Sequence, residues 1–422
     1  MNPVSKISVV GLGYIGLPTA AVFADRGVEV VGVDVNARAV DSINAGKPHI
    51  VEPNLAALLR RVVEAGKLRA TVTVEPADAF IIAVPTPFQD IEGHHWPDVS
   101  YIETAARAVA KVLKPGDLVI LESTSPVGTT ERMCGWMAEE RPDLTFPTQR
   151  GDLSDIRVAH CPERVLPGRI LDEVVNNARV IGGITRRCAQ AALGLYKIIC
   201  EGECRPTNAR TAELAKLTEN AYRDVNIAFA NELSVICDRL KINVWELIGL
   251  ANLHPRVNIL RPGPGVGGHC IAVDPWFIVD SAPEESRLIR TAREVNDHKP
   301  DFVCAKVREK ARHLVEPVIA CLGLSYKKDV DDLRESPAVH IVQALARDPS
   351  LTHDKGGRIL VVEPHITRLP PELDGLGLEL TGFDDAFERA NMVVLLVDHM
   401  SFLQVDRDLL KDKFIIDTVG VW

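Results

Sequence analysis

The sequence has no long apolar run and no excess of positive charge. The longest apolar stretches, such as residues 392–397, are far shorter than the ~20 residues that a membrane-spanning helix needs. The formal net charge is -10 over 422 residues, which argues against nucleic acid or an anionic membrane as the main ligand. We therefore expect neither a membrane segment nor a nucleic-acid partner, although a local basic pocket for an anionic ligand is compatible with this charge.

The nine cysteines show neither a paired framework nor the spacing of a metal site. Their number is odd, and Cys200 and Cys204 lie four positions apart, which is not a usual zinc-finger spacing. The sequence also runs at once into a strand-like segment, with no signal peptide before it. These features predict a cytoplasmic protein with reduced thiols and no metal.

Short apolar runs alternate with helical patterns along the first part of the chain. Residues 7–10, 28–33, 80–84 and 118–121 are typical of buried strands, and residues 17–26 are typical of a helix. This alternation predicts an α/β fold with a doubly wound, mainly parallel sheet.

The middle of the chain predicts helices and the end predicts a second sheet. Residues 211–239 contain neither Gly nor Pro and repeat apolar positions at helical spacing, which indicates one long helix. Strand-like runs return at 318–322, 358–362, 392–397 and 414–416, and segment 319–324 resembles segment 7–13. We expect two related Rossmann-like domains, over residues 1–206 and 316–422, joined by a central helical domain over residues 207–315.

Gly11, Gly13 and Gly16 form a G-x-G-x-x-G pattern between a predicted strand and a predicted helix. In this context the glycines permit a tight turn and a close approach to a pyrophosphate at the helix N-terminus. Asp34 ends the next strand, where its carboxylate can accept hydrogen bonds from a ribose 2′-OH and would repel a 2′-phosphate. The pattern predicts NAD rather than NADP, with Arg38 as a further contact to adenine or phosphate.

Two threonines come just after later strands of the same sheet. Thr86 lies in VPTP and Thr124 lies in ESTSPVGTT. Ligands bind at the carboxyl edge of such sheets, so both are candidate cofactor contacts. For each, a simple loop or cap residue is an equally good interpretation.

Cys270 stands at the end of an unusually glycine-rich segment, RPGPGVGGHC. So many glycines cost chain entropy and indicate a close approach of the backbone to a ligand. A thiol in this position is a candidate nucleophile if it faces positive charge. A lone cysteine is more often an inert core residue, but the flanking His269 and Asp274 favour catalysis here.

Lys216, Asn220 and Arg223 share one face of the predicted long helix, because they lie at i, i+4 and i+7. A solvated polar stripe is the alternative, but the neighbouring apolar positions indicate a helix largely surrounded by other elements. A partly buried lysine could assist proton transfer, and an asparagine could orient a reacting oxygen or a water.

Two further segments resemble anion-binding loops. Glu163 and Arg164 lie in CPERVLPGR, after a strand-like run at residues 158–159. Tyr326, Lys327 and Arg334 lie in YKKDVDDLRES, after the first strand of the C-terminal sheet. The aspartates of the DVDD stretch have no metal-binding spacing, so we expect caps and salt bridges there.

Together these motifs resemble the UDP-sugar 6-dehydrogenases over essentially the whole chain, from GLGYIGLP to the closing DTVGVW. HIVEP, ESTSPVGTT, CPERVLPG, RTAELAKLTEN, HPRVNIL, PGPGVGGHCIAVDPWF and DDLRESPA look most like the branch of this family that acts on UDP-N-acetyl-D-mannosamine. The resemblance implies an NAD-dependent, four-electron oxidation of C6 of the sugar to a carboxylate, for surface polysaccharide biosynthesis.

The resemblance also implies a covalent mechanism. Cys270 would attack the aldehyde left by a first hydride transfer, and a second transfer would give a thioester that water hydrolyses. Lys216 matches the family's proton donor and acceptor, which also steadies the oxyanion. Asn220 and Asp274 match residues that orient oxygen or water, and Glu163 matches a nearby carboxylate with a related role.

Further ligand contacts follow from the same resemblance. Contacts to NAD are implied for Tyr14, Ile15, Asp34, Thr86, Thr124 and Arg334. Contacts to the UDP-sugar are implied for Arg164, Val165, Lys216, Asn220, Arg223, His254, Arg256, Gly267, Tyr326 and Lys327. In this family the equivalent of Arg256 is typically supplied across a dimer interface, so a homodimer is implied.

The sequence departs from the family pattern at two positions and leaves alternatives open. Val419 stands where relatives usually carry a Lys or Arg, and Lys328 stands where many carry Pro, so UDP-glucose and UDP-N-acetylglucosamine stay open as substrates. A non-catalytic dinucleotide-binding regulator would be expected to lack the thiol or the lysine, yet Cys270 and Lys216 are both present. A simple hydroxyacid dehydrogenase would need neither Cys270 nor a second nucleotide-binding sheet.

Overall fold

The computed structural model describes residues 4–91, 94–166, 168–268, 270–352 and 356–422. The chain forms two compact units. The first comprises Met1–Glu219 and Trp276–Ala282, and the second comprises Asn220–Pro275 and Pro283–Trp422. The long helix α9 (Ala209–Leu240) contributes its first turns to the first unit and the rest to the second.

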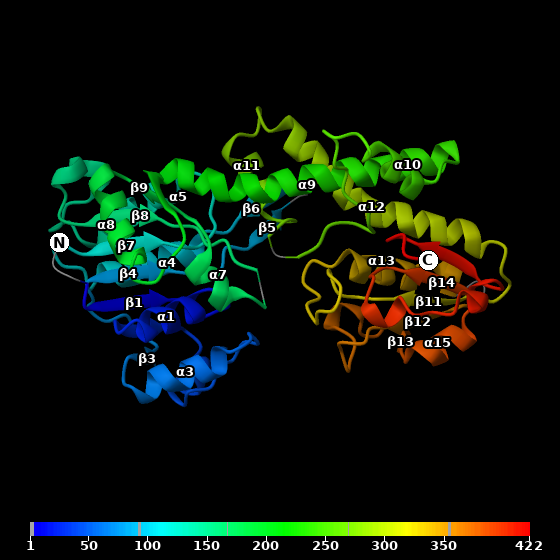
Figure 1. Ribbon diagram of the computed structural model, residues 1–422, viewed down its shortest axis with the longest axis horizontal. Helices are drawn as coiled ribbons and strands as arrows, with labels where there is room; N and C mark the ends of the chain where they lie inside the picture. Colours follow the sequence, from blue (N-terminus) through cyan, green and yellow to red (C-terminus); the bar gives the residue numbers. More distant parts are fainter. Residues whose placement is uncertain (1–3, 92–93, 167, 269, 353–355) are drawn as a thin grey trace. The chain divides into compact units, whose positions relative to one another are not determined.

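The first unit is built on an eight-stranded sheet of order β10-β9-β8-β7-β4-β1-β2-β3 (Figure 1). The strands are β1 (Lys6–Val10), β2 (Glu29–Val33), β3 (Leu68–Thr71), β4 (Ala79–Ile82), β7 (Leu118–Leu121), β8 (Arg157–His160), β9 (Arg179–Gly183) and β10 (Cys204–Asn208). All neighbours pair in parallel except β8 and β9, which are antiparallel. The predicted doubly wound, mainly parallel sheet is confirmed.

Helices cover both faces of this sheet, which explains why its strands are apolar almost throughout. One face packs against α1 (Gly16–Asp25), α3 (Leu55–Glu64), α7 (Ile170–Asn176) and α8 (Arg186–Tyr196), and its buried cluster includes Ile7 and Val9. The other packs against α4 (Ser100–Ala110) and α5 (Thr129–Glu140), and includes Val10 and Val31. Successive side chains of a strand thus point to opposite faces of the sheet and pack into different hydrophobic clusters.

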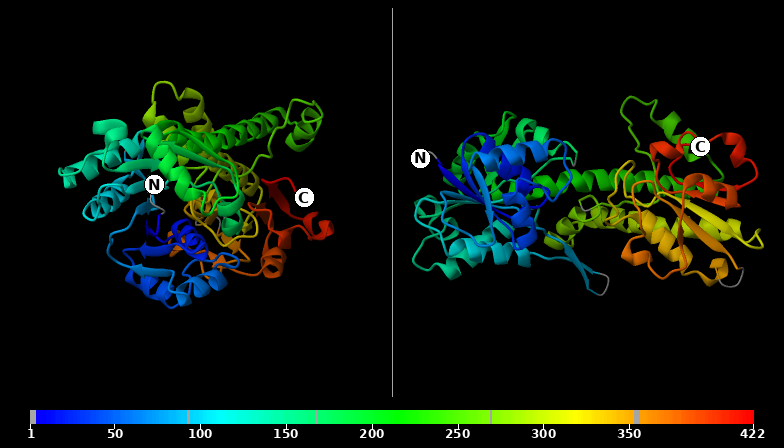
Figure 2. Two further views of the ribbon diagram at one scale, coloured as in Figure 1. Left: turned by 60° about the vertical axis from the view of Figure 1, so that its left-hand side comes forward. Right: turned by 90° about the horizontal axis from the view of Figure 1, so that it is seen from below.

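Shorter elements complete the first unit. They are α2 (Ala37–Asn44), α6 (Pro147–Arg150), the 3-10 turn η1 (Gly151–Leu153) and most of α11 (Asp274–Ser281). An antiparallel hairpin joins β5 (Phe88–Ile91) to β6 (His94–Pro97). Figure 2 shows this hairpin projecting from the rest of the unit.

The second unit contains a five-stranded sheet of order β13-β12-β11-β14-β15, with all neighbours parallel. Its strands are β11 (Val318–Leu322), β12 (Arg358–Val362), β13 (Glu379–Leu380), β14 (Met392–Leu395) and β15 (Phe414–Asp417). Its helices are α10 (Val244–Ala251), α12 (Arg287–Ala311), α13 (Pro337–Ala346), α14 (Pro349–Thr352) and α15 (Phe383–Arg389), with 3-10 turns η2 (Pro371–Leu373), η3 (Met400–Phe402) and η4 (Arg407–Leu410).

The two sheets repeat one design, as the sequence echo predicts. Strands β4-β1-β2-β3 of the first unit correspond in order to β14-β11-β12-β13 of the second. After β1, the Gly11 amide donates to the Val33 carbonyl at 2.8 Å, and after β11 the Gly323 amide donates to the Val362 carbonyl at 2.8 Å. The same strand-to-glycine turn therefore opens both sheets.

A buried polar network fastens α9 to α12 within the second unit. The Arg293 guanidinium donates to Asp224 Oδ1 at 2.6 Å, and the Asn296 amide donates to the same oxygen at 2.8 Å. The Asn231 side chain donates to Asn296 at 2.8 Å and accepts from the Gly263 amide at 2.9 Å. The network thereby holds the start of the glycine-rich loop as well as the two helices.

Among the described residues, no helix combines the length and apolar character that membrane spanning requires.

Candidate functional site

The carboxyl ends of the first sheet bring together residues that are far apart in sequence. Gly11 follows β1, Asp34 follows β2, Thr86 follows β4 by a few residues, Thr124 follows β7 and Glu163 follows β8. Because β8, β7, β4, β1 and β2 are adjacent and parallel, these five residues lie along one edge. This is the edge at which ligands bind in doubly wound sheets.

The glycine pattern is explained by the turn between β1 and α1. Gly11 has φ +92°, and a Cβ there would lie 2.5 Å from the Ala83 carbonyl oxygen. A Cβ on Gly16 would lie 1.8 Å from the Gly11 carbonyl oxygen, so the helix could not pack against the turn. A Cβ on Gly13 would meet nothing within 4 Å, so this exposed backbone is open to a ligand. With Tyr14 and Ile15 it leads into the N-terminus of α1, whose free N–H groups suit a pyrophosphate.

Asp34 is held in place by the backbone. Its Oδ2 accepts from the Leu12 amide at 2.9 Å, and its Oδ1 accepts from the Asn36 amide at 2.9 Å. Each oxygen keeps a further lone pair, so the carboxylate can also accept from ribose hydroxyls. Arg38 is exposed in the first turn of α2, where its own amide donates to Asn36 Oδ1 at 3.1 Å.

The two candidate threonines are bonded to each other. The buried Thr86 hydroxyl donates to the Thr124 carbonyl at 2.6 Å. Beside them, the Ser123 hydroxyl donates to the Val84 carbonyl at 2.7 Å. The loops after β4 and β7 are thus fastened together, and Thr86 serves at least as a structural link.

Glu163 and Lys216 face each other within the first unit. Burial raises the pKa of Glu163, while the positive charges of Lys216 and Arg179 oppose that rise. Lys216 lies half-buried on α9. A buried carboxyl whose pKa is raised by burial is a candidate general base.

Arg164 has partners inside its own unit. Its Nε donates to Glu219 Oε2 at 3.1 Å, and its Nη1 donates to the Ala178 carbonyl at 3.2 Å. A substrate phosphate would have to compete with Glu219 for this guanidinium. Val165, next along the loop, is partly buried against the sheet core.

The glycine-rich loop of the second unit packs closely against the segment after β11. A Cβ on Gly267 would lie 2.5 Å from the Glu335 carbonyl oxygen and 2.8 Å from Tyr326 Cβ. Gly268 has φ +84°, and a Cβ there would lie 2.8 Å from the Tyr326 ring. Both glycines are therefore required by packing, and Gly268 also by conformation; together they fix the backbone that leads to the exposed Cys270.

Cys270 and Asp274 are joined by a turn that starts α11. The Asp274 amide donates to the Cys270 carbonyl at 2.9 Å. The Asp274 side chain is buried and accepts from the Asn220 amide group at 2.5 Å. The structure thus brings Asn220 and Asp274 together near the thiol's own turn, whereas His269 lies outside the described residues.

The loop after β11 carries the other candidate residues of the second unit. Burial raises the pKa of Tyr326, with Asp332 and Cys270 among the charges that contribute. Lys327 is exposed. Arg334 Nη2 lies 2.6 Å from Asp332 Oδ2, in agreement with the predicted role of the DVDD aspartates in salt bridges.

One His/Asp cluster in the second unit has the composition of a metal site but a different bonding pattern. It comprises Asp329, His365 and His399. His399 Nδ1 accepts from the Asp329 amide at 2.9 Å, so Nε2 carries the proton and faces Glu363 Oε2 at 3.0 Å. Both nitrogens of this buried ring are engaged, so it holds the loop rather than offering a metal ligand.

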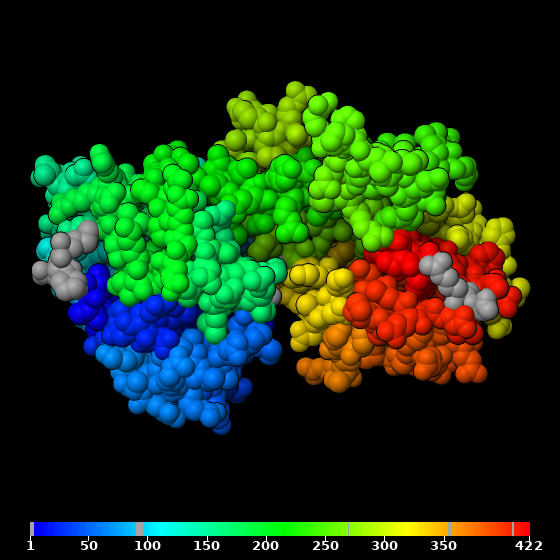
Figure 3. Space-filling model, in the orientation of Figure 1, coloured from blue at the N-terminus to red at the C-terminus, as the bar shows by residue number. Residues whose placement is uncertain are grey.

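His254, Arg256 and Arg223 are exposed on the second unit. His254 Nδ1 accepts from the Arg256 amide at 3.3 Å, which orders the loop after α10. In Figure 3 the green segment around α10 lies open on the surface of this unit.

The closing turn has Val419 where relatives usually carry a basic residue. The side chain of Arg261 contacts this same turn. Arg261 Nη2 donates to the Gly420 carbonyl at 2.8 Å, and its guanidinium lies over the Trp245 ring at 5.4 Å. A cation is therefore present beside Val419 even though the chain carries none at that position.

Several buried acids near the candidate site were not predicted from the sequence. Glu213 on α9 accepts from the Gly128 amide at 2.6 Å and the Thr130 amide at 2.8 Å, which fastens the start of α5. Glu52 accepts from the amides of Gly168 and Ile170, each at 2.8 Å, which fastens the loop after Glu163. Their motifs, AELAK and HIVEP, contained the acids, but nothing local in sequence indicated their partners.

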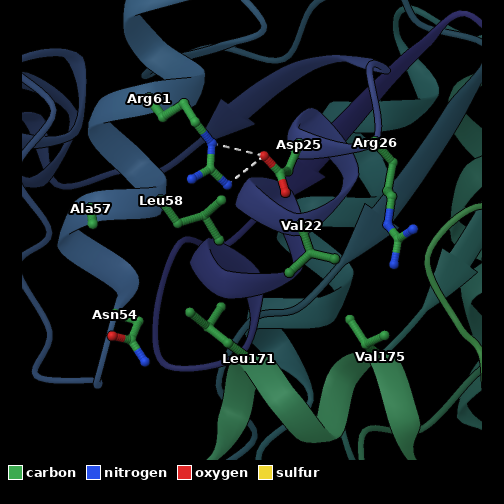
Figure 4. Close-up of a pocket in the computed structure, with 9 residues that line it drawn as sticks. All are labelled: Val22, Asp25, Arg26, Asn54, Ala57, Leu58, Arg61, Leu171 and Val175. Carbon is green, nitrogen blue, oxygen red and sulfur yellow. Dashed lines mark hydrogen bonds and ion pairs between the residues drawn. The ribbon is translucent and has the colours of Figure 1, made fainter.

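A surface pocket lies elsewhere on the first unit. It has a volume of about 510 Å³ and lies among α1, α3 and α7. Figure 4 shows that Arg61 points to Asp25 across it. The charged groups that line it are already paired, as with Arg26 and Glu201 at 2.8 Å, so among the described residues it offers no unpaired charge to a ligand.

Comparison with known proteins matches three consecutive parts of the chain to the three domains of one family. Residues 5–200, 210–298 and 320–422 match the NAD binding domain, the central domain and the UDP binding domain of the UDP-glucose/GDP-mannose dehydrogenase family. An NDP-N-acetyl-D-galactosaminuronic acid dehydrogenase of Ralstonia nicotianae is 62% identical, covering 99% of this chain and 96% of its own. A UDP-N-acetyl-D-mannosamine dehydrogenase of Campylobacter jejuni is 59% identical, covering 97% and 98%.

A solved structure has the same fold over nearly its full length. It is a UDP-D-ManNAc dehydrogenase of Pyrococcus horikoshii, which is 39% identical and matches with a TM-score of 0.85, covering 99% of this chain and 96% of the other.

Proposed function

The chain belongs to the UDP-glucose/GDP-mannose dehydrogenase family, and we propose that its substrate is UDP-N-acetyl-D-mannosamine, which it oxidises at C6 to UDP-N-acetyl-D-mannosaminuronate. It is an NAD-dependent UDP-sugar dehydrogenase. The observation that carries the proposed substrate is that relatives 57–59% identical over nearly the whole chain bear this substrate in their names. We further propose that the acid it makes is used for surface polysaccharide.

The first unit fits NAD. The open backbone at Gly13, the N-terminus of α1 and the fixed Asp34 carboxylate supply the groups that a dinucleotide needs. Bound NAD accepts the hydride of each oxidation. We assign Gly11, Gly16, Tyr14, Ile15, Arg38, Thr86, Thr124 and Arg334 to the same cofactor.

We propose that Cys270 provides the covalent step between the two oxidations. Its thiolate adds to the C6 aldehyde, and the resulting thiohemiacetal loses the second hydride to become a thioester. The bond to sulfur keeps the aldehyde from leaving before it is oxidised again. Lys216 takes and returns the proton of the C6 oxygen and stabilises its negative charge.

Hydrolysis of the thioester completes the reaction. Water adds to the thioester carbonyl, Glu163 accepts a proton from it, and the tetrahedral adduct expels the Cys270 thiolate to leave the carboxylate. Asn220 and Asp274, already bonded to each other, orient the oxygen and the water. Removal of either side chain takes away the hydrogen bond that holds the two groups together.

We assign ten residues to the nucleotide and the sugar. They are Arg164, Val165, Lys216, Asn220, Arg223, His254, Arg256, Gly267, Tyr326 and Lys327. Arg261 is a further candidate, because it supplies a cation beside Val419.

A homodimer is also proposed, with Arg256 donated to the partner's site. Tyr222, Phe229 and Ile236 are exposed on α9 and lie seven positions apart, so they form one apolar stripe. Such a stripe on a helix is typical of a helix-packing surface. Phe229→Asp should give a monomer in light scattering. Activity should return when an Arg256→Ala variant is mixed with a Cys270→Ala variant only if the site is shared between the subunits.

A second substrate is supported by a specific observation. The Ralstonia relative, at 62% identity, is named for a galactosaminuronic acid. Both sugars carry a 2-acetamido group and differ in ring stereochemistry. UDP-N-acetylgalactosamine therefore joins UDP-N-acetylglucosamine and UDP-glucose as the alternatives to be assayed.

The test is the amount of NADH formed per sugar with each of the four UDP-sugars. About two NADH per sugar, with the mannosamine substrate showing the highest kcat/KM, supports both chemistry and specificity. A different preferred sugar would replace the substrate and keep the Cys270 chemistry. One NADH per sugar would refute the thioester, and Cys270→Ala should abolish sugar-acid formation.

A cytoplasmic location is proposed on the state of the thiols. All nine cysteines are free in the structure, as expected in a reducing compartment.

A further inference from the structure

Next to Glu163, the first unit buries a second carboxylate and a guanidinium that the proposed mechanism does not use. Glu122 follows β7 and is 1% exposed, and Arg179 opens β9 and is 5% exposed. The Tyr196 hydroxyl, at the end of α8, donates to Glu122 Oε1 at 3.0 Å. Arg179 Nη1 lies 3.5 Å from the same oxygen.

Arg179 also lies beside Glu163. Arg179 and Glu163 line one small cavity of about 10 Å³, which has room for about one water molecule. The guanidinium is fixed over the Tyr196 ring at 4.7 Å and donates to the Val174 carbonyl at 3.3 Å. One fixed cation therefore serves two buried carboxylates.

Neither carboxylate is fully satisfied by this cation. Glu122 Oε2, Glu163 Oε1 and Arg179 Nε are buried without a hydrogen-bond partner in the part of the chain that the structure describes. Buried polar atoms in this state are costly. The cluster is therefore maintained against a free-energy penalty, beside a residue assigned to the reaction.

Few other titratable groups face the pair. Burial raises the pKa of Glu122 to about 7, against the charge of Arg179, and Glu163 adds to the rise; Tyr196 and Thr19 oppose it. Burial raises the pKa of the Cys161 thiol to about 12, so that group stays neutral. On its other side, Glu163 faces Lys216.

We propose that Glu122 is a positioning residue for thioester hydrolysis: it competes with Glu163 for the guanidinium of Arg179 and so sets how strongly Glu163 takes a proton from the attacking water. The inference rests on the function proposed above, in which Glu163 is the base for that water. No new bond is involved, because the proton passes from water to Glu163 and the Cys270 thiolate leaves as before.

The direction of the effect follows from charge. When Glu122 is protonated, the field of Arg179 acts on Glu163 alone and weakens it as a base. When Glu122 ionises, it shares the cation and repels the Glu163 charge, so Glu163 becomes a stronger base. Hydrolysis should therefore gain an upward step as pH passes through about 7. If ionisation of Glu122 raises the pKa of Glu163 by about one unit, and the Brønsted slope is about one half, the rate of hydrolysis rises about threefold.

The experiment follows hydrolysis of the acyl-enzyme in the full-length protein. Enzyme is mixed with NAD and the UDP-sugar that it oxidises fastest, and the covalent sugar acid on Cys270 is followed by quenched intact-protein mass spectrometry across a pH series. Glu122→Gln fixes the uncharged form of the side chain. Asp117→Asn is the matched control, because Asp117 is also buried, lies at the other end of β7 and pairs with Lys114.

We expect Glu122→Gln to form the acyl-enzyme normally and to lose the upward step near pH 7, while Asp117→Asn keeps it. Tyr196→Phe removes a hydrogen bond that lowers the Glu122 pKa, so its step should move to higher pH. A Glu122→Gln profile that superimposes on the wild type, or an equal loss of rate at every pH, would overturn the inference. Absence of any acyl-enzyme in the wild type would instead refute the proposed mechanism itself.

Discussion

The close packing of Gly267 predicts that one methyl group in the glycine-rich loop disables the enzyme. In Gly267→Ala the new Cβ would lie 2.5 Å from the Glu335 carbonyl oxygen and 2.8 Å from Tyr326 Cβ. Both are backbone or near-backbone atoms that cannot rotate away, so the loop itself must move. Overpacking of this kind costs about 1–3 kcal/mol, of which the lower chain entropy of alanine returns about 0.4–1 kcal/mol.

A displacement of about 1 Å at a reacting group can cost about 100-fold in rate. Because Cys270 lies three residues after Gly267, we expect kcat/KM for the UDP-sugar to fall about 100-fold. The KM for NAD should change less, because the residues assigned to the cofactor belong to the other unit except for Arg334. Initial rates of NADH formation, with both substrates varied, give these values.

Gly263 provides the matched control in the same loop. A Cβ there would meet only the Gly265 carbonyl oxygen, at 3.8 Å, which is ordinary contact. Gly263→Ala should therefore keep its kcat/KM within about twofold and gain slightly in stability. If Gly267→Ala retained wild-type kcat/KM and an unchanged melting temperature, the argument that this loop is fixed by steric contact would be wrong.

Three further predictions follow from buried polar groups. Burial lowers the pKa of His160 to about 3, whereas the unfolded chain binds this proton near the ordinary pKa of about 6.5. The free energy of unfolding should therefore fall as the pH falls from about 6.5 to about 3. In urea titrations across this range, His160→Leu should show a pH dependence of that free energy that is smaller by about one proton. Glu213→Ala leaves the Thr130 amide unpaired at the start of α5 and should lower the free energy of unfolding by about 1–3 kcal/mol in urea titration; an unchanged midpoint would contradict this. Asn220→Ala removes a donor that orients the buried Asp274 carboxylate, so kcat should fall more than KM rises, and an effect confined to KM would refute the assigned role.

The sequence predicted those strands that are short apolar runs bounded by turns, whereas β3, β9 and β10 were not predicted. Predicted residues 118–121 and 358–362 coincide with β7 and β12, and the long helix predicted at 211–239 is α9, which extends from Ala209 to Leu240. Burial of strands on both faces makes such runs continuous, so pattern and structure agree. The antiparallel pairing of β9 with β8 was not predicted, because a strand's direction depends on how its connection crosses the sheet and not on its composition.

The candidate site was predictable where a motif carries its own geometry. The glycine turn and the acid after β2 belong to one local supersecondary unit, and the structure joins them by a hydrogen bond from the Leu12 amide to Asp34. Thr86 and Thr124 lie 38 positions apart, and their direct bond follows only from the adjacency of β4 and β7. Sequence reasoning placed both at the same edge but could not pair them.

The acidic residues that sequence reasoning missed share one physical role, and this role explains why the sequence did not reveal them. Glu52, Glu213 and Glu363 each accept two or more backbone N–H groups of a loop that is distant in sequence. A loop that binds a ligand cannot satisfy its amides with a neighbouring strand, because that space is needed for the ligand, yet buried amides without partners are costly. A carboxylate reaching in from another element resolves the conflict, and its ionised form gains more than a neutral acceptor would. Since such a carboxylate needs only to arrive at the right place in the fold, its position in sequence carries no pattern, and in a chain with 58 acidic residues only the three-dimensional structure distinguishes these three from the solvated majority.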